Sequence, residues 1–484
     1  MGSVEPLLNL LGIILVGVGL VVPTIDYGLK KNTSRWISLI ALLVAMVFSF
    51  GLMSLTLING PELAYGGALK VDFYGAFLFT IATLGAFLVT LASFTQTKKW
   101  TTAPSYFSLL LLTLVGVYFI ISVNDLVLLL AAWALVSVAS YAIVAVKKDE
   151  SSLEGSSKYA LMGITASAFM LYGIAILYGV SGSTDMKAIA QFAVASGSPA
   201  ILIAVIMLVV AFGFKIGVVP FHGWLPDVYG GVHPLLISYI SAVVKVAGVA
   251  ALLRIVYPFA ISLGDRWLVL FAALSIVTMT FGNVAALIQR NVQKMMAYSS
   301  LAHVGYILVG FAAATGGVGA AYGVQGIGLH LAAYILATTG IFVALAYMAE
   351  KGVKTDLESI SGLWRRMPVL STSTAILVLS LIGMPPLLGF WSKFLYLFIS
   401  TVQVAPWLTL IAIANTGLSV GYYGQIIRYI FSTSGTSESM VSAERLRDPE
   451  VIAVVIATVL TLVLGLGIAP SIASMLNLPS LPGS

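Results

Sequence analysis

Residues 214–222 read FKIGVVPFH, and this short stretch decides the fold. A lysine, Lys215, stands inside a long apolar run, and Gly217 and Pro220 follow it within five residues. Proline removes a backbone donor, and its ring clashes with the preceding turn of a helix. The stretch therefore predicts a helix that breaks beside a lysine. Freed backbone groups are tolerated in a membrane only where they are buried or line water.

A second segment repeats this combination farther along the chain. Gly383, Pro385 and Pro386 precede Lys393 within the apolar residues 369–397. Paired apolar segments interrupted by glycine and proline, at corresponding places in two halves, are typical of transporters built from inverted repeats. A kinked packing helix would explain the prolines alone, but it would not explain a lysine beside each break.

The composition indicates that both segments lie in a membrane. Apolar residues make up 60% of the 484 residues, charged residues only 9%, and the mean hydropathy is +1.05. A soluble chain of this length needs far more charge to cover its surface. The net charge of +6 does not indicate nucleic-acid binding, because the basic residues lie in short loops rather than on one face. The chain has no cysteine, so it has no disulfide and no thiolate ligand for an iron–sulfur cluster.

The apolar runs predict an all-α membrane protein with about fourteen spans, each long enough to cross a hydrocarbon core of roughly 30 Å. We expect a single domain over residues 1–484, and a first run that is retained, because no basic segment precedes it and no small-residue cleavage site follows it. The expected spans are 7–23, 36–57, 73–95, 105–122, 125–146, 157–180, 199–224, 234–257, 266–288, 299–315, 325–349, 369–397, 403–430 and 451–472.

The basic residues test this count, since lysine and arginine accumulate in cytoplasmic loops. With both termini outside, these residues fall on the inner side: Lys30, Lys31, Arg35, Lys98, Lys99, Lys147, Lys148, Lys158, Arg290, Lys294, Lys351, Lys354, Arg365, Arg366, Arg428, Arg445 and Arg447. Only Lys70, Lys187, Arg254 and Arg266 fall outside. A missed helix would place the later basic loops on the wrong side and remove this asymmetry. The pattern therefore favours an even number of spans, with both termini on the same side.

Three lysines remain, and all three lie inside apolar segments: Lys215, Lys245 and Lys393. A lysine near a helix end can extend its charge to the headgroups. Lys245 cannot, because about 17 Å of helix separates it from either end of its span at 1.5 Å per residue. A charge near the midplane costs at least about 2.5 kcal/mol. We therefore expect Lys245 to face a hydrated interior, where a desolvated amine can exchange a proton near neutral pH.

The histidines extend this pattern. His222 ends the motif of the seventh span, His303 lies early in the tenth span, and His330 lies early in the eleventh. A lone histidine in a helix is more often a packing residue, but His303 and His330 lie between the lysine-bearing spans. We expect these three histidines to relay protons. His233 precedes Pro234 in a loop and is expected at the membrane interface.

Three longer stretches resemble the antiporter-like membrane subunits of respiratory complex I. They read FKIGVVPFHGWLPD at 214–227, VVKVAG at 243–248 and RNVQKMMAYSSLAHVGY at 290–306. The resemblance extends over nearly the whole chain. Two features resemble the N-type subunit in particular: the form of the third stretch, and a lysine rather than a glutamate in the twelfth span. N-type subunits include those of archaeal enzymes that oxidise a reduced deazaflavin.

The resemblance implies two inverted five-helix repeats, made by helices 4–8 and 9–13 with helices 7 and 12 broken, around a central hydrated axis. In this chain the first repeat would cover residues 105–257 and the second 266–430. Residues 1–98 would form three peripheral helices, and 451–472 the last helix. Flavin, iron–sulfur clusters and quinone would be held by partner subunits of the membrane arm and its redox arm, with no cofactor or metal in this chain. The expected location is a prokaryotic plasma membrane.

The same resemblance assigns roles by motif position. Lys215 resembles the gating lysine of the first half-channel, Lys245 the bridging lysine, and Lys393 the lysine that faces the outlet. His303 and His330 resemble the relay positions between them. The chain would then move protons along this axis, coupled to electron transfer elsewhere in the complex.

One position departs from the family. The fifth span usually carries a glutamate in a Trp-Glu-Leu context, whereas this sequence has Trp133, Ala134 and Leu135. No acidic residue is expected deep in any span, and Asp72 and Asp125 lie at span ends. The charged form of the seventh-span lysine would therefore lose its usual counter-ion.

Two other functions remain open on the same fold. One is a subunit of a multi-subunit cation/proton antiporter or of a membrane-bound hydrogenase, and the His303 motif and Lys393 weigh against it. The other is a scaffold subunit that conducts no protons. The alanine at position 134 leaves this possibility open.

Overall fold

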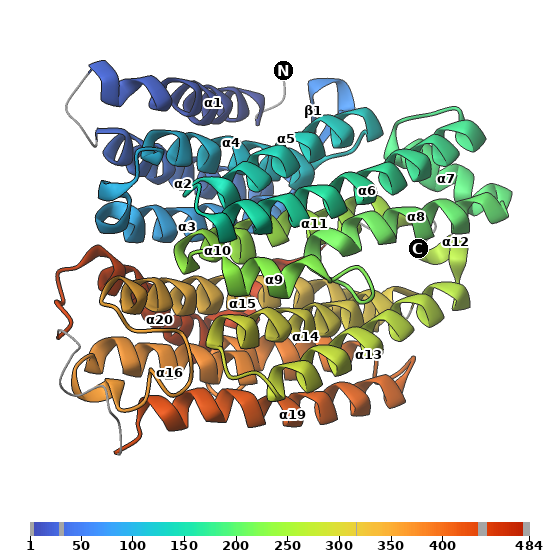
Figure 1. Cartoon of the computed structure of the whole chain (residues 1–484). Coiled ribbons are helices and arrows are strands. Elements are labelled where there is room, and N and C mark those ends of the chain that lie inside the picture. Colours follow the sequence, from blue (N-terminus) through green and yellow to red (C-terminus); the bar gives the residue numbers. More distant parts are fainter. Residues whose placement is uncertain (1–3, 29–32, 316, 434–442, 478–484) are drawn as a thin grey trace.

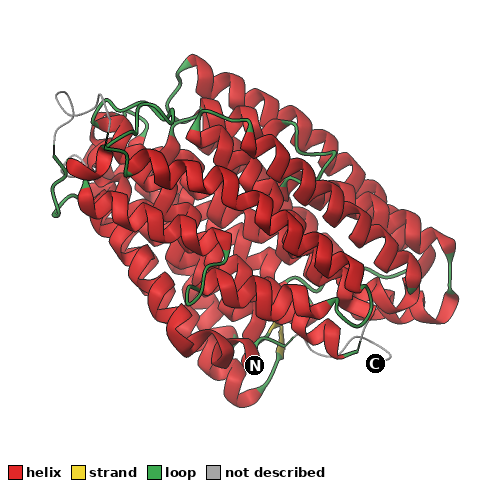
Figure 2. Cartoon of the chain, turned by 90° about the horizontal axis from the view of Figure 1, so that it is seen from below, coloured by secondary structure: helices red, strands yellow, loops and turns green. Residues whose placement is uncertain are grey.

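The computed structural model describes residues 4–28, 33–315, 317–433 and 443–477. Helices lie side by side along one direction, and the strands are confined to one small hairpin near the N-terminus (Figures 1 and 2). This hairpin pairs β1 (Glu62–Ala64) with β2 (Leu69–Val71) in antiparallel register, through a short turn at Tyr65–Gly67.

The first part of the chain forms the helices α1 (Glu5–Gly28), α2 (Thr33–Asn59), α3 (Phe73–Gln96), α4 (Ala103–Ser122), α5 (Leu126–Ala145), α6 (Glu150–Ser181), α7 (Met186–Ser196), α8 (Pro199–Ile216) and α9 (Trp224–Gly231). The next span is a composite of α10 (Pro234–Tyr239), a π-helical turn at Ile240–Val244, α11 (Lys245–Ala251), a second π-helical turn at Leu252–Val256, a short turn at Tyr257–Phe259 and α12 (Ala260–Leu263). π-Helical turns inside a helix are rare and often lie at functional sites.

The second part forms α13 (Asp265–Leu287), α14 (Val292–Ala312), α15 (Val318–Glu350), α16 (Pro368–Ile382), α17 (Leu388–Phe390), a π-helical segment at Trp391–Leu397, α18 (Phe398–Ser400), α19 (Pro406–Ile430), α20 (Pro449–Val463), a turn at Leu464–Ile468 and α21 (Ala469–Met475). Twelve helices of the described residues are long and apolar enough to cross a membrane. The halves of the broken segment 368–400 and the helix α19 supply two further spans. The predicted count of about fourteen is therefore confirmed.

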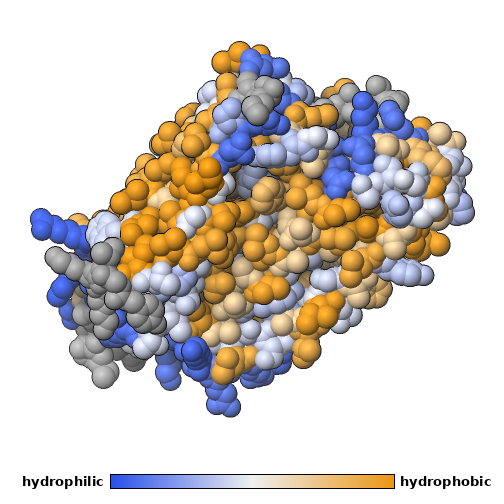
Figure 3. Space-filling view, turned by 90° about the horizontal axis from the view of Figure 1, so that it is seen from above, coloured by the Kyte–Doolittle hydropathy of each residue, from blue (hydrophilic) through white to orange (hydrophobic). Residues whose placement is uncertain are grey.

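The surface agrees with a membrane location. Hydrophobic atoms cover the flank shown in Figure 3, whereas hydrophilic atoms gather toward opposite ends of the molecule. The predicted inner cations that the structure describes lie at the end where α2, α16 and α20 begin, to the left in Figure 1. We refer to this end as the basic end and define it by Lys98, Lys147 and Lys351. Lys30 and Lys31 lie outside the described residues.

The predicted breaks are confirmed at both places. Helix α8 ends at Ile216, and Gly217 then adopts a left-handed φ of 88°. Helix α16 ends at Ile382, and Gly383 adopts a left-handed φ of 95°. Only glycine enters this region at little cost, which explains its place at both helix ends.

The capping bonds of the two breaks match one another. At the first break, the N–H groups of Gly217 and Val218 both donate to the carbonyl of Gly213. At the second, the N–H groups of Gly383 and Met384 both donate to the carbonyl of Leu379. The two breaks therefore share a local geometry as well as a sequence pattern, although the exact boundaries of the two repeats remain a prediction.

Several helix ends differ from the sequence-based expectation. The seventh span breaks after Ile216 as expected, but the helix that follows the break, α9, extends to Gly231 rather than ending at residue 224. The sixth span begins at Glu150 rather than 157, because Asp149 caps the helix by accepting from the N–H of Ser152. The short helix α7 was not expected at all, because its 11 residues are too few to cross a membrane.

The centre of the bundle consists of α15 and the composite segment 234–263, in each of which an apolar stretch of 18 residues is wholly buried by the other helices. Helix α14 joins them and packs very closely on α13, since a Cβ atom added at Gly305 would lie 2.5 Å from the backbone nitrogen of Met279. Small residues permit such close contact between membrane helices. The lysines and histidines singled out by the sequence lie on and around these central helices.

Candidate functional site

Three buried lysines form the framework of the site. The side chains of Lys215, Lys245 and Lys393 belong to residues that are 2%, 3% and 0% exposed. Each ammonium nitrogen donates to uncharged oxygens and lies over at least one aromatic ring. Within the described part of the chain, none of the three pairs with a carboxylate.

Lys215 lies at the end of α8 and faces α5. Its Nζ atom donates to the hydroxyl oxygens of Ser137 and Ser140 at 3.2 and 3.3 Å. The ring centroids of Tyr141 and Tyr159 lie 5.1 Å from the same atom. Hydroxyl dipoles and ring faces can stabilise an ammonium group, but less strongly than a carboxylate would.

Helix α5 offers Lys215 no acidic partner. Ala134 lies one turn before Ser137 on α5 and is exposed on the surface of the chain. A carboxylate at this position would lie near the hydroxyl groups that Lys215 contacts, because residues three apart on a helix share a face. In this chain the two serines are the partners of the lysine instead.

Lys245 follows the first π-helical turn of the composite span. Its Nζ atom donates a short hydrogen bond to the hydroxyl of Ser300 on α14, and it lies 4.9 Å from the ring centroid of Tyr334 on α15. The Tyr334 hydroxyl also donates to the Ser300 hydroxyl, at 2.8 Å. One serine oxygen thus connects a lysine with a tyrosine at the centre of the bundle.

His303 and His330 form a buried pair between α14 and α15. The Nδ1 atom of His303 lies 3.0 Å from the Nε2 atom of His330, and both residues are 1% exposed. The other nitrogen of His303 lies 3.0 Å from the Tyr423 hydroxyl, and the other nitrogen of His330 lies 3.0 Å from the Ser392 hydroxyl. All four ring nitrogens therefore have polar partners, which is the arrangement that a proton relay needs.

Lys393 directly follows Ser392 in the chain, and its Nζ atom lies 4.4 Å from the ring centroid of Tyr306. Its Nζ atom donates to the carbonyl of Leu381 at 2.7 Å and to the carbonyl of Ile382 at 3.4 Å. These carbonyls belong to the last turn of α16 and are available because the helix ends there. The break in the twelfth span therefore supplies the oxygen ligands of the lysine beside it.

The polar line is interrupted between the halves of the chain, and among the described residues no hydrogen bond joins Ser299 to Ser300 or Ser392 to Lys393. Helix α11 packs directly on α8, since a Cβ atom added at Gly248 would lie 3.3 Å from the Cβ atom of Lys215 and 2.4 Å from a methyl of Ile216. No hydrogen bond joins Lys215 to Lys245 within the described residues. The structure therefore brings Lys245, His303, His330 and Lys393 together and leaves Lys215 beside them.

Two of the four histidines stand apart. His222 lies in the turn after the first break and is half-buried. Its ring centroid lies 4.7 Å from that of Phe281, and it has no contact with the histidine pair. His233 caps α10, because its Nδ1 atom accepts from the N–H of Leu235 at 3.3 Å. Burial first, and the positive charge of Lys147 second, lower the pKa of His233 to about 4.

Arg254, which the basic-residue pattern placed on the outer side, has a buried partner that was not predicted. It is 9% exposed and forms a bidentate pair with Asp72, with both nitrogen–oxygen distances 2.6 Å. Its Nε atom also donates to the carbonyl of Ile121 at 2.7 Å. The position of Arg254 inside an apolar run, with an aspartate before the third span, was the signal that could have revealed this pair.

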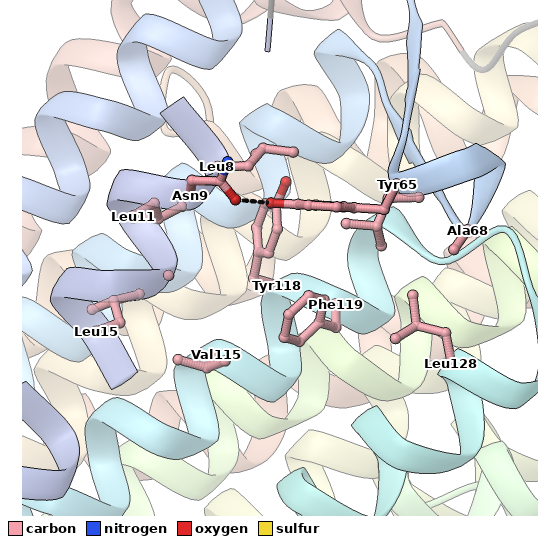
Figure 4. Close-up of a pocket in the computed structure, with 12 residues that line it drawn as sticks. Leu8, Asn9, Leu11, Leu15, Tyr65, Ala68, Val115, Tyr118, Phe119 and Leu128 are labelled. Carbon is pink, nitrogen blue, oxygen red and sulfur yellow. Dashed lines mark hydrogen bonds between the residues drawn. The ribbon is translucent and has the colours of Figure 1, made fainter. Parts of the chain in front are cut away.

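A surface pocket lies away from this site. It is lined by apolar side chains of α1, α4 and α5 and by the hairpin, among them Leu11, Val115 and Phe119 (Figure 4). The Tyr65 hydroxyl donates to the Asn9 side chain across its rim, at 2.7 Å. The pocket contains none of the buried lysines or histidines.

Comparison with known proteins agrees with this architecture. The family described as NADH:quinone oxidoreductase/Mrp antiporter, TM matches residues 123–419. The chain is 34% identical over 437 residues to F(420)H(2) dehydrogenase subunit N of Methanosarcina mazei, with 87% of each chain covered. It is 33% identical over 439 residues to NADH-quinone oxidoreductase subunit N of Rhodospirillum rubrum, with 89% of this chain and 87% of the relative covered.

Solved structures share the fold. A chain of respiratory complex I from Thermus thermophilus with bound Aureothin is 29% identical and has a TM-score of 0.80, with 97% of this chain and 99% of that chain covered. A chain of the Mrp complex from Dietzia sp. DQ12-45-1b has a TM-score of 0.85 at 20% identity, with 98% of this chain and 96% of that chain covered. At this identity the likeness shows a shared fold only.

The broken helices and the buried line of lysines and histidines define an antiporter-like membrane subunit. The chain belongs to the NADH:quinone oxidoreductase/Mrp antiporter transmembrane family.

Proposed function

We propose that this chain translocates protons as a membrane-arm subunit of a complex I-type quinone or phenazine oxidoreductase. The buried array of Lys245, His303, His330 and Lys393 carries this proposal most directly. Two relatives above 30% identity, named as N subunits of dehydrogenase or oxidoreductase complexes, support it.

The relay would exchange protons along existing hydrogen bonds from Tyr423 through the histidine pair to Ser392, and water would bridge the remaining distance to Lys245 and Lys393. A neutral imidazole has one donor and one acceptor nitrogen, so the His303–His330 bond can pass a proton and then reset by a change of tautomer. Ser299 and Ser300 are consecutive, and they bond to Tyr423 and Lys245 respectively. Tyr423 in turn contacts His303, so hydroxyl groups extend the relay from the histidines toward Lys245.

Lys215 would act as the proton-exchanging group of the first half. Its serine and ring partners hold the ammonium group without an opposite charge, so a neighbouring charge from another subunit would strongly change its proton affinity. The exposed face around Ala134 is where such a partner charge could approach. Water would then be needed to bridge the packed segment between Lys215 and Lys245.

The redox chemistry would take place in partner subunits. Thiolate ligands for iron–sulfur clusters must come from those subunits, because this chain has no cysteine. We further propose that the basic end faces the cytoplasm and that both termini lie on the opposite side, since short cytoplasmic loops carry an excess of lysine and arginine.

Purification through a tag on this chain tests the proposal. Reconstituted into vesicles, the purified assembly should reduce a quinone or phenazine and move protons only while electrons flow. An assembly that exchanges cations for protons but contains no quinone-reducing partner would instead identify a multi-subunit antiporter. An assembly that reduces quinone with no dependence of proton transport on this chain would identify a scaffold.

A further inference from the structure

Buried polar atoms without partners concentrate at the basic end. Twelve of the described residues carry such atoms, and six of these residues lie on four neighbouring helices: Thr90 and Gln96 of α3, Thr339 of α15, Ser371 and Thr374 of α16, and Glu450 of α20. We refer to these residues as the inlet cluster. Every member is at most 6% exposed, and none of the named side-chain atoms finds a hydrogen-bond partner among the described residues.

The four helices of the inlet cluster pack on one another. Helix α15 contacts α3, α16 and α20, and α20 also contacts α3 and α16. A Cβ atom added at Gly340 would lie 2.3 Å from Leu377 of α16 and 3.4 Å from Ala457 of α20, so three of the helices meet one residue beyond Thr339. Each member of the inlet cluster therefore lies on α15, on α20 or on a helix that packs against both of them.

Glu450 is the charged member of the cluster. It is 0% exposed, its Oε1 atom accepts a short hydrogen bond from the hydroxyl of Thr95, and its Oε2 atom has no partner in the described residues. The Gln96 side chain lies beside the same carboxyl but makes no hydrogen bond of ordinary geometry. A carboxyl group buried in this way needs water or a proton to complete its partners.

The cluster extends from the basic end toward the proposed relay. At 1.5 Å per residue, Thr90 lies about 9 Å along α3 from Gln96, and Thr339 lies about 16 Å along α15 from Glu350. The carbonyl of Thr339 accepts from the Ser238 hydroxyl at 3.4 Å. Ser238 lies two turns before Lys245 on the composite span, so the deepest member of the cluster adjoins the helix that carries this lysine.

Acidic residues near Glu450 favour the same direction of transfer. Glu350 and Asp448 lie near Glu450 and add negative charge, while Lys351 lies 4.0 Å from Asp448. Negative charge near a proton-accepting group raises the local concentration of hydronium. Buried hydroxyl groups without protein partners are the sites where ordered water is found in proteins.

We propose that the inlet cluster is a water-filled proton inlet from the basic end, with Glu450 as its proton-accepting group. The Glu450 carboxylate takes a proton from hydronium, which leaves as water, and the resulting acid passes that proton to water held by Thr90, Thr374 and Thr339. This inference rests on the proposed function, because the inlet supplies the relay at Lys245.

Cysteine labelling tests the water directly and independently of pumping. The chain has no cysteine, so Thr90→Cys and the control Ala92→Cys can be introduced singly into the whole complex. Both positions are 0% exposed, but Ala92 lies closer to the basic end and is 200° around α3 from Thr90, on an apolar face. A small, membrane-impermeant thiol reagent applied from the basic end should modify the cysteine at position 90 about tenfold faster, as detected by the mass of this chain. Equal labelling, or none at position 90, would overturn the inlet.

Glu450→Gln tests the acid. In the reconstituted complex this change should lower the number of protons moved per electron, whereas Glu358→Gln, at an exposed acid of the same end, should leave it unchanged. Glu450→Asp should restore part of the loss, which separates a proton-accepting role from a structural one. Normal pumping in assembled Glu450→Gln would overturn the role of this residue.

The two experiments together separate the inlet from the proposed function. If the cysteine at position 90 is not labelled but the complex pumps normally, the inlet is rejected and the proposed function stands. If the cysteine is labelled in a complex that never pumps, the proposed function is rejected.

Discussion

The Nδ1 atom of His303 and the Nε2 atom of His330 lie 3.0 Å apart inside the bundle, with each ring bonded to a hydroxyl group on its far side. Only one proton can lie between these two nitrogens at a time. The pair therefore holds a proton in one of two positions, and each position sets the tautomers of both rings.

We predict that His330→Gln slows proton transport by this subunit by roughly 100-fold, the scale of a lost acid–base group. Glutamine keeps a polar side chain but cannot pass a proton by changing tautomer. Proton uptake per electron, measured in vesicles containing the whole complex, is the readout. His222→Gln is the control, because His222 does not contact the pair, and equal losses in the two variants would contradict the relay.

The glycine–proline pattern predicted both helix breaks, because Gly217 and Gly383 must adopt backbone angles that other residues avoid. The apolar periodicity and the basic loops likewise predicted the number of spans. The partners of the lysines were not predictable. A serine in a membrane helix usually bonds to the carbonyl one turn before it, and nothing in the sequence shows that Ser137 and Ser300 instead face a lysine.

We predict that Ala134→Glu strengthens proton binding at Lys215 and shifts the pH dependence of pumping toward higher pH. An opposite charge about 4–6 Å away would stabilise the ammonium form, which the two serines hold only by dipoles. Pumping measured across a pH series is the test, with Ala134→Gln as a control of similar size and no charge. An unchanged profile in the assembled glutamate variant would show that this position does not control Lys215. Impaired activity would show that a partner subunit already places an acid there.

We predict that Asp72→Asn destabilises the protein by about 3–5 kcal/mol, because it leaves the guanidinium of Arg254 buried without its counter-charge. The pair joins the start of α3 to the end of the composite span, far from the relay. Thermal unfolding of the purified complex measures the loss. Glu358→Gln breaks the exposed pair with Arg290 and should have a much smaller effect, and equal losses would contradict the importance of burial.

We predict that acid weakens the start of α10 through His233. The folded protein holds this histidine neutral with a pKa of about 4, below its ordinary value near 6.5, so the unfolded chain binds more protons between these two pH values. Stability should therefore fall as the pH drops from about 6.5 toward 4. His233→Asn keeps a capping side chain that does not titrate. Thermal unfolding of this variant should depend less on pH in that window, and an identical dependence in both proteins would exclude His233 as the cause.

The proton-to-electron ratio of the complex carrying Lys245→Ala tests the central claim most directly. Lys245 lies at the centre of the bundle, bonded to Ser300 and far from both membrane surfaces, so packing alone does not require its charge. Assembly is checked first by purification of the intact complex, and quinone reduction is measured in the same vesicles. We predict an assembled complex that still transfers electrons but moves fewer protons for each one. An assembled variant that pumps at the wild-type ratio would contradict a proton path through this lysine.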